Sequence, residues 1–410
     1  MDKIYLHVKG NTISMEEKTL IFIPYQDSDN FLSDGILTRE FAMLYLFWKA
    51  GYKKVINVKK PRTILDKKKY TIRPEFYPSG TIESVVRDIL NEAETVQYLP
   101  AIDLRQVLER RCWWKDGYKK TEKYLNLKNS ISYTVYSDNP FAEHLIHYLS
   151  NNGCKIYFDV MDNFAIHPSL NEKERMDALE GYKKILSFAD CVSANSHQTC
   201  DYMSKYTSKE ILLIKNGVFE NNEVQREVSL AEIKKIHDKK KHFKKCVGYI
   251  GKLGLRLDAN LIAAVSNKCA DTLFVFVGGY LNGQINKRLL DLFKTQNNIL
   301  HIDAVPSAFV YPILDEFDIL SIPHSVGKNE NGGDPLKLYQ YLTRKKPIIT
   351  TPILGVDEFK NFIFISDDFQ EWVNYINKPH KKDFSTMGTD FVWSKRIVPV
   401  FEQLDCKGIG

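Results

Sequence analysis

Short apolar runs alternate with helical patterns along most of this 410-residue chain. The runs that read as strands include residues 19–24, 54–58, 132–136, 154–160, 272–277, 319–322 and 347–350. Because parallel strands are joined by crossover connections that usually contain a helix, this alternation predicts an α/β fold with parallel sheets. After the first run, Ser33-Asp34-Gly35 is expected to open a helix that carries Phe41, Leu44 and Phe47 on one face.

The alternation stops once and then restarts, which predicts two domains. After Asn216-Gly217-Val218 the chain is polar and rich in lysine, and a new strand pattern begins at residue 246. The chain is also longer than the ~150–200 residues of one typical domain. The expected boundaries are a Rossmann-like domain over residues 1–215, a linker over 216–245, a Rossmann-like domain over 246–385 and a final helical segment over 386–410. The lysine-rich stretch also fits a solvated surface helix within one domain.

The most informative motif is a glycine-rich turn, Gly332-Gly333-Asp334-Pro335, that opens a helix with Lys337 in its first turn. The first turn of a helix presents unpaired N–H groups and the positive end of the helix dipole, which together favour an anion. Lys337 adds a full positive charge at the same point. The motif therefore indicates a phosphate or diphosphate site. The alternative is a helix that is merely started by Asp334 as its cap and Pro335 at its first position.

Three further turns of the second domain are expected beside the same ligand, because ligands of open α/β sheets bind beyond the carboxyl ends of the strands. Gly251 and Lys252 follow one strand, where glycine lets the backbone approach a ligand and lysine can reach a phosphate. Gly278 and Val305 follow later strands, where backbone groups can hold a ribose and read a base edge. Taken singly, each turn fits a structural role better than a functional one.

Several segments share their pattern with a known group of enzymes. These are PLKLYQYL at residues 335–342 with KPI at 346–348, NGV at 216–218, GYIG at 248–251, FDVMDNF at 158–164 and WSKR at 393–396. They resemble the GT-B glycosyltransferases, in particular the retaining, family-4-like enzymes that use nucleotide-sugar donors in teichuronic-acid and capsule synthesis. The resemblance is strongest over residues 154–355. It implies two Rossmann-like domains that face each other across a cleft, with a C-terminal helix that crosses back to the first domain.

One feature departs from that family, which usually carries two glutamates with seven residues between them, the second on this helix. Here Gln340 stands at the second position and Gly332 at the first, with Glu330 two residues earlier. Gln340 can still hydrogen-bond a ribose hydroxyl, but a neutral hydrogen bond contributes about 1 kcal/mol against about 1.5–3 for a charged one. The donor affinity would then fall about tenfold. The resemblance further implies that Glu330 holds sugar hydroxyls and that the donor also contacts Gly333, Asp334 and Leu338.

The resemblance implies transfer of a sugar from a nucleotide diphosphate donor to a hydroxyl of a glycan or lipid-linked glycan, with retention at the anomeric carbon. The diphosphate gains negative charge as the glycosidic bond breaks, and Lys252, Lys337 and the helix N-terminus would stabilise that charge. Neither a cofactor nor a metal is expected, since no D-x-D motif stands in a convincing loop.

The first domain is expected to hold the acceptor. Asp162, at the end of a strand, is the candidate for orienting the acceptor hydroxyl, and His167 stands close to it in the chain. Asp34 and Gly35 follow the first strand, where backbone groups could approach the donor phosphates or the acceptor. The alternatives are that Asp162 caps the following turn and that His167, which precedes a proline, is an ordinary loop residue.

Other functional classes are left open or excluded by the sequence. A GT-B subunit that binds nucleotide-sugar and supports a partner enzyme, with weak or no turnover of its own, is the main alternative. An epimerase would need acid and base side chains that the sequence does not identify. The sequence argues against a nicotinamide dehydrogenase, since the first strand of neither domain is followed by G-x-G-x-x-G.

Charge and cysteine usage bear on location. Nine lysines and arginines crowd residues 53–73 with one opposing acid, a run that can bind an anionic membrane surface or form a solvated loop. No nucleic-acid motif is present. The seven cysteines form no C-x-x-C pair, which is typical of buried thiols in a reducing compartment, and the start of the chain does not resemble a signal peptide. We therefore expect a cytoplasmic protein, peripheral on the inner face of the plasma membrane if the basic run binds lipid.

Overall fold

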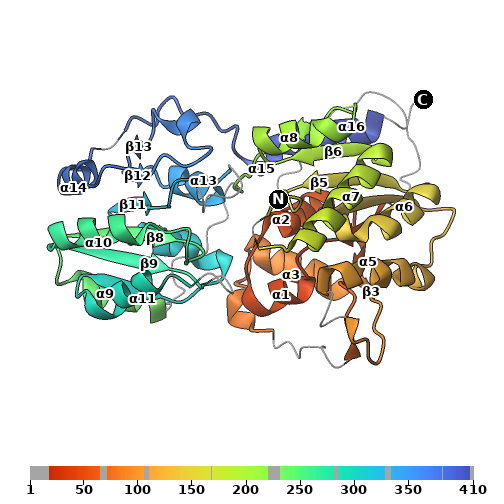
Figure 1. The fold of residues 1–410 in the computed structure, drawn as a ribbon, viewed down its shortest axis with the longest axis horizontal. Coiled ribbons are helices and arrows are strands. Elements are labelled where there is room, and N and C mark those ends of the chain that lie inside the picture. Colours follow the sequence, from red (N-terminus) through yellow and green to blue (C-terminus); the bar gives the residue numbers. More distant parts are fainter. Residues whose placement is uncertain are drawn as a thin grey trace.

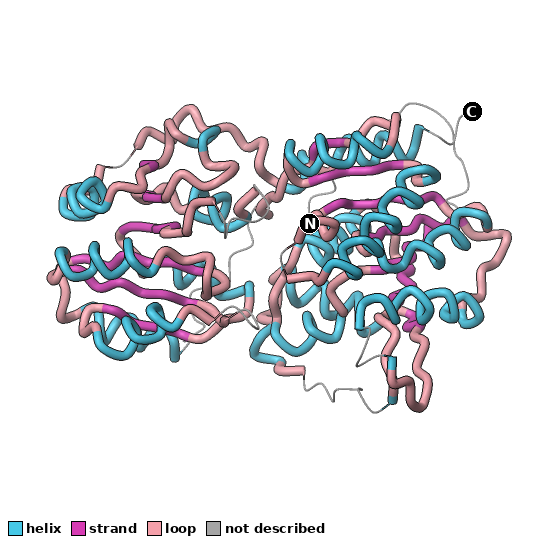
Figure 2. Tube along the Cα trace, viewed as in Figure 1, coloured by secondary structure: helices cyan, strands magenta, loops and turns pink. Residues whose placement is uncertain are grey.

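The computed structural model describes residues 18–64, 72–105, 110–167, 169–219, 231–280, 285–327, 334–380 and 382–406, which form two α/β domains lying next to each other (Figure 1). Within these residues each domain is built on one parallel sheet, of seven strands in the first domain and six in the second. Helices flank both sheets (Figure 2). The α/β architecture expected from the alternation is therefore confirmed.

The first domain has the strand order β3-β2-β1-β4-β5-β6-β7. Its strands are β1 (Lys18–Ile23), β2 (Lys54–Val58), β3 (Glu94–Val96), β4 (Ser132–Ser137), β5 (Lys155–Val160), β6 (Cys191–Ala194) and β7 (Leu212–Leu213). Its helices are α1 (Ser28–Asp34), α2 (Arg39–Lys49), α3 (Ile82–Glu92), α5 (Arg110–Thr121), α6 (Glu143–Asn151), α7 (Glu172–Phe188) and α8 (His197–Met203), with short 3₁₀ turns η2 (Pro74–Phe76), η3 (Glu122–Tyr124), η4 (Pro140–Ala142) and η5 (Ser204–Tyr206).

The second domain has the strand order β10-β9-β8-β11-β12-β13. Its strands are β8 (Lys245–Ile250), β9 (Thr272–Val277), β10 (Ile299–Ile302), β11 (Ile319–Ile322), β12 (Ile348–Thr350) and β13 (Phe364–Ile365). Its helices are α9 (Ala231–Lys240), α10 (Ala259–Lys268), α11 (Lys287–Thr295), α12 (Val310–Asp315), α13 (Leu336–Thr343) and α14 (Phe369–Asn377), with η6 (Ser307–Phe309) and η7 (Asp357–Phe359).

Both faces of each sheet are buried, which explains why the strands read as continuous apolar runs. In β1, Ile21 and Ile23 pack into the core on one face of the sheet, while Leu20 and Phe22 pack into the core on the other. Every residue of β9 is buried. Successive side chains of a strand point to opposite faces, so a strand covered on both sides must be apolar at every position.

The C-terminal segment crosses back to the first domain, as the resemblance implied. It contains α15 (Trp393–Arg396) and α16 (Val398–Cys406), which lie beside β6 and α8 in Figure 1. Val400 and Leu404 are buried in the first domain's core, and Lys155 donates a hydrogen bond to the backbone oxygen of Leu404 at 2.7 Å. The second domain is therefore followed by chain that packs on the first.

The expected helix start at Ser33-Asp34-Gly35 is wrong, because this tripeptide ends one helix instead. Gly35 adopts a left-handed φ of 64° and its N–H bonds to the backbone oxygen of Phe31, so it closes α1 as a C-cap. The helix that carries Phe41 and Phe47 is α2, which begins at Arg39 after Thr38. A glycine with positive φ stops a helix far more readily than it starts one.

No helix in the described part of the chain is long and apolar enough to cross a lipid bilayer.

Gly248 in β8 should be intolerant of any side chain. A Cβ at this position would lie 1.9 Å from the ring of Phe317, which packs directly on the strand. We expect Gly248→Ala to lower the free energy of unfolding by about 1–3 kcal/mol through overpacking, measured by urea denaturation. The control is Gly279→Ala, whose nearest neighbour would be Ala304 at 3.6 Å, an ordinary contact. Equal stability of the two variants would contradict the packing described for this strand.

Candidate functional site

Two glycines at the carboxyl ends of β8 and β9 bring the backbone close to the side chain of Lys337. Gly251 has φ 146°, and a Cβ there would lie 2.8 Å from the Lys337 Nζ. Gly278 has φ 153°, and a Cβ there would lie 1.9 Å from the backbone oxygen of Gly251. The structure therefore brings together three residues that the sequence singled out, and both glycines are needed where they stand.

Lys337 is held by an aromatic hydroxyl and an imidazole. Its Nζ lies 2.7 Å from the hydroxyl of Tyr249 and 3.1 Å from the Nε2 of His324. The Tyr249 hydroxyl in turn lies 3.1 Å from that Nε2 and donates to the backbone oxygen of Lys252 at 2.9 Å. No carboxylate contacts the Lys337 ammonium among the residues that the structure describes.

The electrostatics of this group reflect burial among positive charges. Burial lowers the pKa of Lys337 well below its ordinary value, and the charges of Arg256 and Lys252 lower it further. Burial also holds the pKa of His324 well below its usual range, with Lys337 and Arg256 adding to the effect. An anion bound here would raise the pKa of Lys337, because an opposite charge favours the charged form.

Arg256 belongs to the site and was not identified from the sequence. It lies four residues after Lys252 in the turn between β8 and α10, and its Nε is buried with no hydrogen-bond partner among the described residues. Lys252 is exposed. We call Lys252, Arg256 and Lys337 the cation cluster. A second basic residue in the turn after Gly251 was the signal available in the sequence.

The first domain faces the cation cluster through the segment after β5. The pKa of His167 is lowered by burial, raised by Asp162, and lowered by Arg256 and Lys252 of the other domain. The backbone oxygen of Asp162 accepts a hydrogen bond from Tyr182 at 2.7 Å, and Ser169 contacts the Nδ1 of His167. His167 is therefore within electrostatic reach of Asp162 and of two basic residues of the second domain.

The turn that contains Gly35 contacts the second domain directly. The backbone oxygen of Gly35 accepts from the N–H of Ser307 at 2.9 Å, and the Leu37 N–H donates to the Ser307 hydroxyl at 2.8 Å. A Cβ at Gly35 would lie 2.9 Å from that of Pro306. Val305 precedes this contact and packs partly on the second domain's core. Asp34 is exposed and bonds to Ser33 at 2.7 Å.

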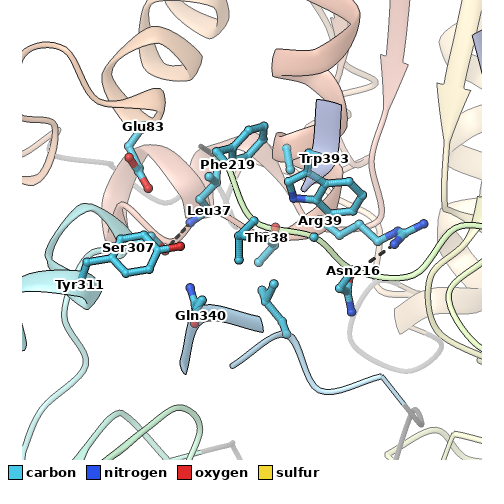
Figure 3. Close-up of a pocket in the computed structure, with 14 residues that line it drawn as sticks. Leu37, Thr38, Arg39, Glu83, Asn216, Phe219, Ser307, Tyr311, Gln340 and Trp393 are labelled. Atoms are coloured by element: carbon cyan, nitrogen blue, oxygen red, sulfur yellow. Dashed lines mark hydrogen bonds between the residues drawn. The ribbon is translucent and has the colours of Figure 1, made fainter. Parts of the chain in front are cut away.

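A separate cavity lies between the domains, bounded by the junction at residues 216–219 on one side and by Ser307 and Tyr311 on the other (Figure 3). Gln340 points into it from α13, and Thr38, Arg39 and Trp393 line it from the side of the first domain. Lys337 is not among the residues that line this cavity, although it belongs to the same helix as Gln340.

Of the remaining predicted donor residues, two make contacts within the protein and two lie outside the described part. Leu338 is fully buried in the second domain's core, and its N–H bonds to the backbone oxygen of Pro335 at 2.9 Å. The carboxylate of Asp334 accepts from the backbone N–H of Asn216 and from the Tyr339 hydroxyl. Glu330 and Gly333 lie outside the described residues.

The basic run at residues 53–73 does not form one surface in its described part. Lys53 lies over the ring of Trp48 at the amino end of β2, whereas Lys59 and Arg62 follow the carboxyl end of the strand. Lys59 pairs with Asp29 at 2.5 Å and Arg62 pairs with Asp27 at 2.9 Å. Residues 65–71 lie outside the described part.

Comparisons with solved structures identify the architecture. No protein-family model matches the sequence, and no curated protein is similar to it at the sequence level. The structure is similar to sucrose-phosphate synthase from Thermosynechococcus elongatus, with a TM-score of 0.61 and 13% identity over 95% of this chain and 99% of that one. It is also similar to HepE from Anabaena in complex with UDP, with a TM-score of 0.54 and 14% identity over 95% and 97% of the two chains.

The chain has the GT-B fold. A third similar structure, the UDP-forming α,α-trehalose-phosphate synthase from Burkholderia vietnamiensis, has a TM-score of 0.54 and 10% identity over 96% of this chain and 94% of that one. Such coverage is too high to leave out either domain of this GT-B chain. The two Rossmann-like domains facing each other, expected from the resemblance, are thereby confirmed.

The partly desolvated ammonium of Lys337 has no acidic partner in the described structure and should lower the stability of the fold. Removal of this ammonium should therefore raise the stability. The pKa of Lys337 is lower in the folded chain than in the unfolded one, so the unfolded state binds more protons between the two values and stability rises with pH across that window. We expect Lys337→Met to raise the unfolding temperature at pH 7, by about 2–4 °C for each 1 kcal/mol regained, and by less at pH 10. The control is Lys268→Met, at an exposed lysine in the last turn of α10. A lower unfolding temperature for Lys337→Met would contradict this account of the site.

Proposed function

We propose that this chain is a glycosyltransferase that moves a sugar from a nucleotide-diphosphate sugar to a hydroxyl of a glycan acceptor. The observation that carries the proposal is the cation cluster, three basic side chains with no carboxylate partner among the described residues. Lys252 is exposed, but Lys337 and Arg256 are half-buried, and withdrawing their charges from water is costly unless a ligand supplies the opposite charge. The likeness to HepE structures that hold UDP or UDP-glucose supports a nucleotide-sugar as that ligand and makes UDP the first nucleotide to test.

In this proposal the cation cluster receives the diphosphate and stabilises its charge during transfer. Negative charge develops on the diphosphate as the glycosidic bond breaks, and fixed positive groups placed there act without reorganising. Arg256 would offer its buried Nε to a phosphate oxygen, and Lys337 would offer its ammonium from the first turn of α13. Three positive charges and a helix N-terminus would offset the diphosphate without a metal, which stays a prediction.

The acceptor would bind on the opposite face of the cleft. Asp162 would accept a hydrogen bond from the acceptor hydroxyl and so orient its oxygen toward the sugar. The charges of Asp162, Arg256 and Lys252 all act on the pKa of His167, which supports a position near the reacting groups. Retention at the anomeric carbon rests on the resemblance to family-4-like enzymes.

The wider setting follows from the same resemblance. We propose assembly of a bacterial cell-surface polysaccharide or glycoconjugate, such as a capsule, by a cytoplasmic enzyme. Association with an anionic membrane through residues 53–73 draws little support from the described part of that run, since Lys59 and Arg62 already have acidic partners.

The test is release of nucleoside diphosphate from UDP-, GDP-, dTDP- and ADP-sugars by the wild type, with and without EDTA. We expect hydrolysis of one donor, unchanged by EDTA. Lys337→Ala and Arg256→Ala should each weaken binding of that nucleoside diphosphate about tenfold or more, since a charged hydrogen bond contributes about 1.5–3 kcal/mol. Lys268→Ala, which changes an exposed lysine of the same domain, is the matched control.

Each outcome has a clear reading. A nucleotide-sugar that binds but never releases nucleoside diphosphate, even with mixed glycan acceptors, would favour the non-catalytic binding subunit. Gln340 is the sequence support for that alternative. Loss of activity in EDTA would overturn the metal-free mechanism. Binding of no nucleotide at all would contradict the phosphate site.

A further inference from the structure

A line of hydrogen bonds connects the sheet of the first domain to the start of α13, the helix that carries Lys337. We propose that Arg39, Asn216 and Asp334 form a positioning relay, in which the first domain fixes where α13 presents Lys337 to the donor diphosphate. Asp334 is then a positioning residue and not a ligand of the donor. The inference rests on the proposed function, since it assigns residues that act through the phosphate site.

The relay begins at a rigid point of the first domain. Arg39 in α2 donates two hydrogen bonds to Asp159 in β5, from Nε at 2.7 Å and from Nη2 at 2.9 Å. The side chains of this ion pair are 2% and 0% exposed. Ser193 donates a further bond to Asp159 at 2.7 Å. A two-pronged, buried contact of this kind fixes the direction of the guanidinium.

Asn216, the first residue of the domain junction, contacts both domains. Its Oδ1 accepts a hydrogen bond from Arg39 Nη1 at 3.3 Å, on the side of the first domain (Figure 3). Its Nδ2 donates to the backbone oxygen of Asp334 at 3.0 Å, and its backbone N–H donates to the Asp334 carboxylate. Asn216 therefore connects Arg39 of the first domain with Asp334, which stands two residues before α13.

Asp334 contacts α13 through one local bond and the domain junction through a long-range one. Its Oδ1 accepts from the Tyr339 hydroxyl at 2.5 Å, and its Oδ2 accepts from Asn216. Tyr339 is fully buried, and the guanidinium of Arg396 from the crossing segment lies 4.5 Å from its ring centroid. Both carboxylate oxygens are thus occupied within the protein, which leaves Asp334 poorly suited to bind a donor.

The start of α13 depends on these contacts because it lacks a local cap. Pro335 stands at its N-cap position and makes no side-chain capping bond, and the helix is only eight residues long. A short helix without a cap is held mainly by its tertiary contacts. Lys337 lies in the first turn, so a shift of Asp334 moves the ammonium relative to Gly251 and Tyr249.

The test is a double-mutant cycle between Asp334 and Lys337, read out as UDP affinity by calorimetry at low ionic strength. If Asp334 acts through Lys337, Asp334→Ala lowers the UDP affinity about tenfold in the wild type and less than twofold in the Lys337→Ala background. Tyr339→Phe, which removes one hydroxyl, should give a smaller loss of the same kind. Asp334→Asn, which retains one carbonyl acceptor, should recover part of the affinity.

Lys215→Met is the matched control. Lys215 also joins the junction to the second domain, through an ion pair with Glu358 at 2.8 Å, but the described residues give it no contact with α13. We expect it to bind UDP as the wild type does. A purely structural role for Asp334 would lower the unfolding temperature without a coupled loss of affinity.

The outcomes separate this inference from the proposed function. If the wild type binds no nucleoside diphosphate, the proposed function fails and the inference falls with it. If the wild type binds UDP and Lys337→Ala weakens that binding, the proposed function stands. In that case an unchanged affinity in Asp334→Ala and Tyr339→Phe, or losses that simply add in the double variant, would overturn the relay alone.

Discussion

A half-buried lysine, Lys337, whose ammonium has no carboxylate partner in the described structure, is the constraint on which the candidate site depends. Gly251 must lack a side chain because Lys337 Nζ occupies the space where a Cβ would lie. Gly278 must lack one because the backbone oxygen of Gly251 occupies the corresponding space. The Tyr249 hydroxyl connects Lys337 with the turn after β8, because it accepts a hydrogen bond from Lys337 and donates one to the backbone oxygen of Lys252. The partly desolvated ammonium of Lys337 lowers stability, so its presence points to a ligand that restores it.

The two domains contact each other at two places. They meet at the junction through Asn216 and at the turn where Gly35 contacts Ser307. Asn216 and Ser307 line the cavity in Figure 3 from opposite sides. The crossing helix α16 anchors the far end of the chain in the first domain. In our proposal the cleft brings a donor and an acceptor together because its two walls are tied at several points.

The sequence was a good guide to features governed by local pattern. Apolar strands such as β9 and the glycine turns after β8 and β9 could be predicted, because burial on both faces and close backbone approach leave a clear pattern. The sequence is a poor guide to features that depend on contacts between residues distant in the chain. The basic run at residues 53–73 gave no hint that Asp27 and Asp29 pair with Arg62 and Lys59.

The donor helix shows the same limit. The resemblance places Asp334 at the donor, whereas its carboxylate contacts Tyr339 of the same helix and, across the domain junction, Asn216, a contact that depends on how the domains meet. Arg256 was missed because only the folded turn brings it beside Lys337. Gly35 was misread because a glycine beside a helix pattern can belong to either end, and only its φ decides.

The most direct test of the central claim is a crystal structure of the protein with UDP. We predict that the diphosphate lies within about 3 Å of Lys337 Nζ and Arg256 Nε, at the carboxyl ends of β8 and β9. A diphosphate bound elsewhere, for example in the cavity that Gln340 lines, would contradict the assignment of the cation cluster as the phosphate site.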